Sequence, residues 1–328
     1  MRILNIFVLL FVVTWSGFWW FSMTQFESSI KNWFENAHFS NYRKYESISV
    51  SGYPNRLDAT LKNVTVVNKN SEFSLSAPLI QFLTVIYNKE LIINTIKLPL
   101  NIELKDNQFT IEGELIKTSL KLNNENQIQE FISQGEDLIF KTPKGQLWRI
   151  KNSLLAYDLK QNNAESTYKS HFALNNVQLP SDFIRLIGNT EFFGNSIKKL
   201  TFNGNINLSH TTSNIFLENK IEGIKELELS LDWGKIRSSL NGDLEILEDG
   251  RLSGVFNFKI SSWEEILDYF EIKNILEKET ARIIRGGLTF IASQSSEEKL
   301  LSIPLYLKKN LLFLGPIKIG DITKILYF

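Results

Sequence analysis

The N-terminal stretch is the most apolar part of the chain. From Ile3 to Met23 it reads ILNIFVLLFVVTWSGFWWFSM and contains no charged residue. About 20 apolar residues at 1.5 Å per residue cross a hydrocarbon core of roughly 30 Å. The alternative is a helix buried in a protein core, which is usually shorter. We therefore predict that residues 1–24 form a transmembrane signal anchor.

The two ends of this stretch predict how it is placed. Three tryptophans at its C-terminal end, Trp15, Trp19 and Trp20, are typical of an aromatic belt at the membrane interface. Arg2 and the α-amino group favour a cytoplasmic N-terminus. The bulky sequence WSGFWWFSM offers no small-residue site for signal cleavage. We expect an uncleaved single-pass anchor with the body of the chain outside the cytoplasm.

Residues 25–46 continue the helical spacing as a juxtamembrane connector. Apolar residues recur there at intervals of three and four, with charged residues between them: Phe26, Ile30, Trp33, Phe34 and Ala37. Such a stripe can lie on the membrane surface or pack on the following domain. The sequence leaves both alternatives open.

From about Ser47 onward the period of the pattern changes to two residues. Residues 59–67, 92–98 and 115–122 alternate apolar and polar side chains, as half-buried antiparallel strands do. Glycines precede such alternation at several places and predict turns or bulges there: Gly113, Gly204, Gly242, Gly254 and Gly287. The run Glu248-Asp249-Gly250, between two alternating segments, is the strongest hairpin signal.

Short helical patterns interrupt the alternation. Helices are expected at residues 127–135, 181–187, 263–269 and 275–284. Ser262 and Glu265 have the spacing of a capping box at the third of these helices. Gly286-Gly287 is expected to end the fourth.

These patterns predict a mainly β protein, with an N-terminal transmembrane helix followed by extended, curved antiparallel sheet(s) and a few short helices. No proline-rich or Ser/Gly-rich linker divides residues 47–328, which we interpret as one β-rich domain. The polar stretch 160–170 predicts a possible internal seam near 160–180.

The amino-acid composition argues against several kinds of partner and site. The chain has 36 Lys and Arg against 36 Asp and Glu, and the two signs are interspersed, which argues against a nucleic-acid partner. It has no cysteine, which excludes disulfides, thiolate metal sites and cysteine nucleophiles. Its three histidines, His38, His171 and His210, lie far apart in the sequence. We therefore expect no metal site and no cofactor.

Catalytic motifs are also missing from the sequence. It contains no GxSxG, HExxH, P-loop or dinucleotide fingerprint. The adjacent acids at 136–137, 264–265 and 297–298 would point in different directions in a helix or a strand. We predict no catalytic residues and no enzymatic activity. Convergence of distant carboxylates or tyrosines in the fold is the remaining route to an active site.

Residues 51–61, SGYPNRLDATL, combine a turn signal with a charge pair. Pro54 fixes φ and favours an extended Tyr53, so this segment predicts a tight corner entering a strand. Arg56 and Asp58 are two residues apart and share one face of that strand. The candidate site is therefore Tyr53, Pro54, Arg56 and Asp58. The pair either fixes the corner, or Arg56 recognises a lipid headgroup phosphate or a partner carboxylate.

Several motifs together resemble one known family. They are GYPNRLD at 52–58, FSLSAPLIQF at 73–82, SSWEEIL around Trp263 and SIPLYLKKNLLFLGPIKIG at 302–320. In these residues the chain resembles the domain-of-unknown-function 2125 family of bacterial envelope proteins. The resemblance implies an N-terminally anchored, β-rich bacterial protein with no established activity. We accordingly expect the inner membrane of a Gram-negative bacterium, with the N-terminus cytoplasmic and the body periplasmic.

Two non-catalytic functions fit these observations. In the first, the β-rich module binds or handles a lipid or another apolar ligand in the periplasm. In the second, it is an envelope scaffold or assembly partner with a closed core that acts through protein contacts. The expected partners are the bilayer, through the anchor, then a lipid or apolar ligand or envelope proteins, and no nucleic acid.

Overall fold

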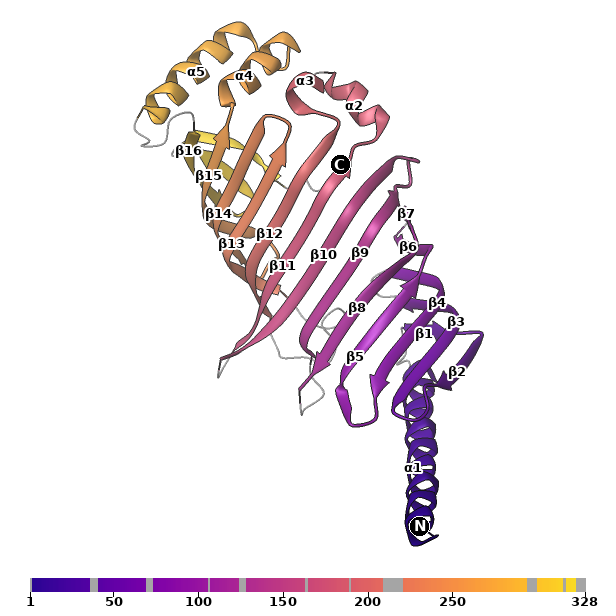
Figure 1. Ribbon diagram of the computed structural model, residues 1–328. Coiled ribbons are helices and arrows are strands. Elements are labelled where there is room, and N and C mark those ends of the chain that lie inside the picture. Colours follow the sequence, from indigo (N-terminus) through magenta and orange to yellow (C-terminus); the bar gives the residue numbers. More distant parts are fainter. Residues whose placement is uncertain are drawn as a thin grey trace. The chain divides into compact units, whose positions relative to one another are not determined.

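The computed structural model describes residues 2–35, 41–68, 73–105, 107–123, 128–162, 165–188, 190–208, 221–293, 300–314 and 317–322 (Figure 1). In this part of the chain eighteen strands follow one long N-terminal helix, and four shorter helices interrupt them. The prediction of a mainly β protein with an N-terminal helix and a few short helices is confirmed.

The chain divides into two compact units. Unit 1 comprises Met1–Ser153 and unit 2 comprises Leu154–Phe328. Strand β10 (Leu147–Asn162) runs through the division, which lies ahead of the 160–180 segment in the sequence. The two units are built differently.

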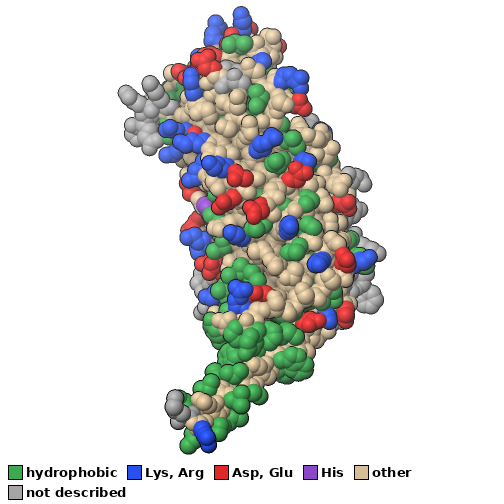
Figure 2. All heavy atoms as spheres, turned by 45° about the vertical axis from the view of Figure 1, so that its right-hand side comes forward, with side chains coloured by type: hydrophobic (Ala, Val, Ile, Leu, Met, Phe, Trp, Pro, Cys, Tyr) green, Lys and Arg blue, Asp and Glu red, His purple; other side chains and the backbone are tan. Residues whose placement is uncertain are grey.

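The N-terminal helix α1 (Arg2–Glu35) is continuous and includes both the predicted anchor and the first half of the connector. In the described part of the chain it is the one helix that is long and apolar enough to cross a membrane. Figure 2 shows hydrophobic side chains over its N-terminal part, whereas charged side chains of both signs are interspersed over the strands. The end of the connector is not helical, because residues 41–44 form strand β1 (Asn41–Lys44).

The C-terminal half of α1 packs on the sheet of unit 1. Phe34 is buried, and Phe26 and Ile30 pack with it against the buried Ala59 and Leu61 of strand β3 (Arg56–Asn68). Burying side chains of this size contributes about 1.5–3 kcal/mol each. Of the two alternatives for the apolar stripe, the structure therefore shows packing on the domain.

The strands of unit 1 include a closed circuit of antiparallel pairings. Besides β1 and β3, this unit contains the strands β2 (Ser47–Ser51), β4 (Phe73–Val85), β5 (Asn88–Lys97), β6 (Leu100–Leu104), β7 (Asn107–Glu112), β8 (Leu115–Leu122) and β9 (Ile128–Lys141). Strand β4 pairs with β5 along its second half and with β6 along its first four residues. From β5 the pairings continue through β8, β9 and β7 and return to β6.

The circuit of unit 1 has its own apolar core. Ala77, Leu98, Leu100 and Leu138 are buried together, and partly buried leucine and isoleucine side chains from the same strands pack around them. Because the strands return to β4, their inward side chains cover one another. The closed arrangement is therefore stabilised by apolar burial within the unit.

Unit 2 is an antiparallel meander in which each strand from β11 to β18 pairs with the next. Its strands are β11 (Glu165–Gln178), β12 (Ser196–Leu208), β13 (Ile221–Trp233), β14 (Ile236–Ile246), β15 (Leu252–Ser261), β16 (Leu300–Lys308), β17 (Leu311–Leu314) and β18 (Ile317–Asp321). Its helices are α2 (Ser181–Ile187), α3 (Thr190–Phe193), α4 (Trp263–Ile272) and α5 (Lys278–Ala292). The four helices gather at one end of these strands (Figure 1).

Several predicted elements are confirmed. The alternating segments 59–67 and 115–122 lie in β3 and β8, and the helix expected at 181–187 is α2. The turn at Glu248-Asp249-Gly250 joins the paired strands β14 and β15, and the Leu247 N–H donates to the Arg251 carbonyl at 2.8 Å. These elements have in common that a local pattern determines them.

The helix predicted at residues 127–135 is wrong, because residues from Ile128 onward form strand β9. Ile128, Glu130 and Phe131 pair with Leu122, Lys121 and Leu120 of β8, with a register irregularity after Ile128. Gly135 pairs with Ile116 and so continues the strand. Pairing along β8 outweighs the local helical tendency.

The prediction that Gly286-Gly287 ends a helix and begins a strand is also wrong, because α5 runs through both glycines to Ala292. Ile284, Leu288 and Ile291 lie on one side of α5 and pack in the core that it shares with β16. That burial exceeds the cost of about 1 kcal/mol for each helical glycine. The capping box is wrong as well, because Ser262 has a φ of 54° and makes no side-chain cap to α4.

Three of the glycines expected at turns lie inside strands instead. Gly204, Gly242 and Gly254 are residues of β12, β14 and β15. A Cβ atom at Gly242 would lie 2.1 Å from the Val255 carbonyl oxygen, and one at Gly254 would lie 2.3 Å from the Asp243 carbonyl oxygen; both would also lie 2.8 Å from the Phe256 ring. These glycines therefore allow a close approach of the neighbouring backbone and of an aromatic ring, and do not mark a change of chain direction.

Candidate functional site

The predicted corner is the turn between β2 and β3. Gly52 has a φ of 108°, and a Cβ atom there would lie 2.8 Å from the Arg56 carbonyl oxygen. The Arg56 N–H donates to the Gly52 carbonyl at 2.9 Å and closes the turn. The Tyr53–Pro54 peptide bond is cis. Glycine is thus required at the first position of the motif by both conformation and space.

Arg56 and Asp58 form the same-face ion pair that their spacing predicts. Arg56 Nη2 lies 2.6 Å from Asp58 Oδ2. The Arg56 side chain is 61% exposed, whereas that of Asp58 is 11% exposed. Asp58 Oδ1 is buried and has no hydrogen-bond partner among the described residues. The guanidinium therefore balances a buried carboxylate and still presents donors to the surroundings.

Two of the predicted interface tryptophans contact this corner. Trp15 Nε1 donates to the Pro54 carbonyl at 2.8 Å, and Trp19 Nε1 donates to the Arg56 carbonyl at 2.9 Å. The Trp19 and Tyr53 rings meet edge to face with centroids 5.4 Å apart. Trp20 makes neither kind of contact among the described residues and is 63% exposed. The indoles of Trp15 and Trp19 thus connect α1 to the corner.

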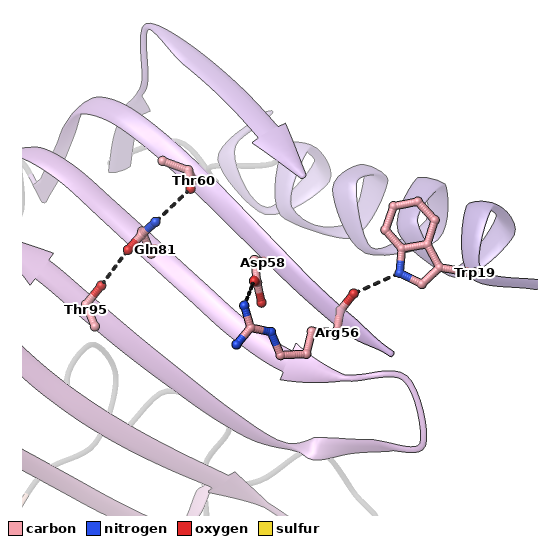
Figure 3. Close-up of polar contacts among 6 residues, drawn as sticks. All are labelled: Trp19, Arg56, Asp58, Thr60, Gln81 and Thr95. Atoms are coloured by element: carbon pink, nitrogen blue, oxygen red, sulfur yellow. Dashed lines mark hydrogen bonds and ion pairs between the residues drawn. The ribbon is translucent and has the colours of Figure 1, made fainter. Parts of the chain in front are cut away.

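A row of hydrogen-bonded polar side chains extends from the corner across three strands (Figure 3). Gln81 Nε2 donates to Thr60 Oγ1 at 3.1 Å, and Thr95 Oγ1 donates to Gln81 Oε1 at 3.2 Å. Register pairs Thr60 with Gln81 and Gln81 with Thr95, so the three lie on one face of β3, β4 and β5. Arg56 and Asp58 share this face, since they alternate with Leu57 and Ala59. We call these five residues the polar track.

The polar track includes residues that were not predicted as site residues. The sequence places Gln81 in the segment FSLSAPLIQF, but nothing local indicates that it bonds to Thr60 and Thr95. Ser16, whose Oγ lies 2.9 Å from the Tyr53 hydroxyl, was likewise not predicted. The sequence does contain a signal for Thr60. Arg56, Asp58 and Thr60 are spaced two residues apart, so Thr60 lies on the same strand face as the predicted pair.

Unit 2 has a sheet surface of a different kind, which we call the apolar face. Cross-strand register aligns one apolar residue from each of six strands in a row: Phe172, Phe202, Leu229, Leu240, Phe258 and Ile303. A second aligned row is Ile206, Ile224, Leu244, Gly254 and Leu307. Leu229 is 39% exposed, and Phe202 and Leu240 are partly exposed.

The opposite surface of the same strands is polar. The row one residue away consists of His171, Asn203, Glu228, Asn241, Asn257 and Pro304. His171 Nδ1 and Asn203 Oδ1 lie 2.6 Å apart, so this histidine is a hydrogen-bonded sheet residue. His38 and His210 lie outside the described residues. The two rows therefore differ in character: the first is apolar throughout, whereas the second is polar except for Pro304.

Helices cover the apolar face at one edge. Leu301 and Ile303 of β16 are buried with Trp263 and Leu267 of α4, and α5 packs on the same cluster. Tyr168 of β11 is also buried, and this burial raises the pKa of its hydroxyl group. Between the edges formed by β11 and β16, the aligned apolar side chains are only partly buried by the described residues.

These surfaces present an exposed cation and partly exposed apolar side chains. In the described part of the chain, no group of three or more His, Asp or Glu side chains is arranged to hold a metal ion. The exposed Arg56 guanidinium has donors for an anion such as phosphate or carboxylate. The apolar face offers a continuous surface for hydrocarbon.

Comparison with known proteins gives one match. Residues 19–323 match the family described as "Uncharacterized protein conserved in bacteria (DUF2125)". No curated protein and no solved structure matches the chain. The match covers the corner, the polar track and the apolar face. The chain therefore belongs to the DUF2125 family of bacterial proteins, as its motifs predict.

Proposed function

We propose that this protein is a non-catalytic, membrane-anchored envelope protein whose apolar face binds a lipid acyl chain or a similar apolar ligand in the periplasm. The observation that carries the proposal is the aligned row of apolar side chains across β11 to β16, which the described residues leave partly exposed. A sheet that does not bury its apolar side in its own core offers that side to another molecule.

The dimensions of the apolar face favour a hydrocarbon chain. Six neighbouring strands about 4.8 Å apart extend for about 24 Å. One leaflet of a bilayer contributes about half of a 30 Å hydrocarbon core, so an acyl chain fits within this length. Each methylene group that leaves water on binding contributes about 0.8 kcal/mol when fully buried. A flat, partly exposed row therefore supplies useful affinity without any specific polar contact.

The anchor and the charge pattern support the proposed location. In this proposal α1 crosses the bacterial inner membrane once, with Arg2 on the cytoplasmic side and both units in the periplasm. The equal numbers of basic and acidic residues support a partner that is neither nucleic acid nor another polyanion. The apolar face then lies in the compartment where a lipid would need protection from water.

The test compares two pairs of substitutions on the same sheet. The first double variant, Leu229→Gln with Leu240→Gln, replaces two directly paired side chains of the apolar face with polar ones. Ser239→Gln with Asn241→Gln changes the residues that flank Leu240 on the opposite face. The full-length protein is purified in mild detergent and its bound lipid is measured by native mass spectrometry. We expect lipid on the wild type and on the Ser239/Asn241 variant, and a several-fold loss on the Leu229/Leu240 variant. Equal lipid on all three proteins, or none on the wild type, would contradict the proposal.

One observation favours a second candidate function, that of an envelope scaffold or assembly partner. Ile283 and Phe290 are exposed on α5, although Ile284, Leu288 and Ile291 of the same helix are turned into the core. A photoactivatable residue at Ile283 in the full-length protein would crosslink to a single protein partner if this function is the main one. In that case the Leu229/Leu240 variant would retain the partner, because its changes are on a different surface.

A further inference from the structure

The turn between β2 and β3 is bound to one short segment of α1. Three side chains within five residues of the helix bind it: Trp15, Ser16 and Trp19. They contact the Pro54 carbonyl, the Tyr53 hydroxyl and the Arg56 carbonyl, with distances of 2.8 to 2.9 Å. Wherever this part of α1 lies relative to a bilayer, the turn lies at the same depth.

The length of the apolar stretch determines that depth. Residues 3–14, which precede Trp15, form a helix about 18 Å long at 1.5 Å per residue. A hydrocarbon core of about 30 Å is longer than this, so a helix that crosses it must continue past Trp19. The segment Trp15–Trp19, and the turn bound to it, then fall within the outer part of the same bilayer.

The backbone of the turn suits such a place. The carbonyls of Pro54 and Arg56 accept the two indole N–H groups. The Gly52 carbonyl accepts the Arg56 N–H at 2.9 Å, and the Asn55 carbonyl accepts the Ile86 N–H at 3.1 Å. An unsatisfied backbone group in lipid costs several kcal/mol, so the pairing of these four carbonyls lowers the cost of placing the turn in a region of low dielectric.

The exposed side chains at this end of unit 1 are those of a membrane interface. Tyr53 is 53% exposed, and Tyr87, in the neighbouring turn after the Ile86 that bonds to Asn55, is 75% exposed. Tyrosine is enriched at the headgroup level. The Arg56 side chain can extend toward phosphate while its charge is partly balanced by Asp58.

We propose that the β2–β3 turn is a second membrane contact, inserted at the boundary between headgroups and acyl chains of the bilayer that α1 crosses, with Arg56 at the level of the lipid phosphates. The inference rests on the proposed membrane span of α1. It adds that unit 1 is seated on the bilayer through a loop of its own sheet, whereas a flexible tether would leave that loop in water.

The test uses nitroxide labels on single cysteines, since the chain has none of its own. The labelled positions are Asn55→Cys in the turn, Val8→Cys in the anchor and Glu103→Cys in β6. Glu103 is exposed and pairs with Ser74, about 36 Å along β4 from the end next to the turn. The full-length protein is reconstituted into vesicles of phosphatidylethanolamine and phosphatidylglycerol, and accessibility to a water-soluble nickel chelate is compared with accessibility to oxygen.

We expect the Asn55 label to be several-fold less accessible to nickel than the Glu103 label, and the Val8 label to be the least accessible. An Asn55 label as accessible as Glu103, with Val8 protected, would overturn this inference and leave the proposed anchor intact. A Val8 label open to nickel would overturn the proposed span and, with it, this inference.

A matched pair of variants tests the role of the indoles. Trp15→Phe with Trp19→Phe keeps aromatic rings but removes both N–H donors, so two carbonyls lose their partners. Nickel accessibility at Asn55 is expected to rise several-fold in this variant and to stay unchanged in Trp20→Phe. The nitroxide line shape of the Glu103 label, compared between the variants and the wild type, reports whether the sheet is still folded. An Asn55 label that is equally protected in both variants would contradict the role given to Trp15 and Trp19.

Discussion

The two units of this protein differ in how they cover the apolar side chains of their strands. In unit 1 the pairings return from β9 through β7 and β6 to β4, and Leu98, Leu100 and Leu138 are buried inside. In unit 2 each strand pairs with the next, and no pairing among its described strands closes a circuit. The first unit encloses a core of its own, although Leu91, Ile93 and Leu104 remain 37–46% exposed, whereas the second leaves an aligned row of apolar residues partly exposed. The two units therefore differ in how far their strand pairings enclose their apolar side chains.

The same contrast is visible in individual side chains. Leu61 in unit 1 has no exposed surface, whereas Leu229, in the middle of the apolar face, is 39% exposed. The energy that an apolar side chain contributes to folding depends on the area it removes from water. Leucines in the two units should therefore differ in what they contribute to stability.

The largest expected effect is at Leu61. Leu61→Ala should lower the free energy of unfolding of unit 1 by about 2–5 kcal/mol, because it leaves a cavity in a packed core. Leu229→Ala should cost less than about 1.5 kcal/mol, because part of its surface is already in water. Hydrogen exchange of the full-length protein in lipid nanodiscs, followed in peptides of β3 and β13, measures both. A loss as large at Leu229 as at Leu61 would mean that the apolar face is covered and would break the comparison.

A smaller effect is expected from adding one methyl group at two glycines of unit 2. Gly242→Ala places a Cβ atom 2.1 Å from the Val255 carbonyl oxygen and 2.8 Å from the Phe256 ring, and should destabilise the sheet by about 1–3 kcal/mol. Gly286→Ala, in α5, meets no atom within 4 Å and should stabilise the helix by up to about 1 kcal/mol. Thermal unfolding of the full-length variants shows whether each substitution lowers or raises the midpoint of unfolding. If both substitutions shift the midpoint in the same direction, the contrast between packed and open positions within unit 2 is wrong.

The two Arg–Asp pairs with a spacing of two residues allow a finer comparison. Arg56 pairs with a buried Asp58 in unit 1, whereas Arg251 and Asp249 in unit 2 are both well exposed. Arg56→Gln should reduce the stability of unit 1 by about 1 kcal/mol, discounted because the guanidinium is largely in solvent. Arg251→Gln should leave unfolding unchanged within error. Urea denaturation of both variants tests this, and an equal effect of the two substitutions would show that the burial of Asp58 does not matter.

The smallest effect is a pH dependence at Asp249. The hydrogen bond from Arg251 lowers the pKa of this carboxyl group below its ordinary value of 3.8. A lowered pKa stabilises the folded state above the unfolded pKa, and this contribution is lost as the pH falls through the folded pKa. The Asp249 carboxyl should therefore titrate below pH 3.8 in the wild type, and closer to it in Arg251→Gln. Carboxyl NMR shifts measure the titration, and identical curves for both proteins would rule out the pair.

The sequence predicts those parts of the fold that local patterns determine. The anchor helix, the strand at 115–122 and the hairpin at Glu248-Asp249-Gly250 each follow from a periodicity or a turn signal within a few residues. Strand β9 and the glycines inside β14 and β15 do not, because their conformation depends on a partner strand. The same holds for α5, where packing of Ile284 and Leu288 outweighs two glycines.

The candidate site likewise has parts that the sequence predicts and parts that it does not. The Arg56–Asp58 pair follows from strand spacing, and the tight turn follows from Gly52 and Pro54. The contacts of Trp15 and Trp19 with that turn join residues separated by 37 to 39 positions, which no local pattern reports. The apolar face depends on the register of six strands, so it emerges only when the cross-strand pairs are known.

One measurement tests the central claim, that the apolar face of unit 2 binds hydrocarbon. A photoactivatable phenylalanine analogue is placed at Leu229 or at its neighbour Glu228, which faces the other side of β13, in the full-length protein expressed in a Gram-negative host. After irradiation of living cells, adducts are identified by mass spectrometry. Phospholipid adducts at position 229 and none at position 228 are the predicted result. No lipid adduct at position 229, or equal adducts at both positions, would contradict the claim.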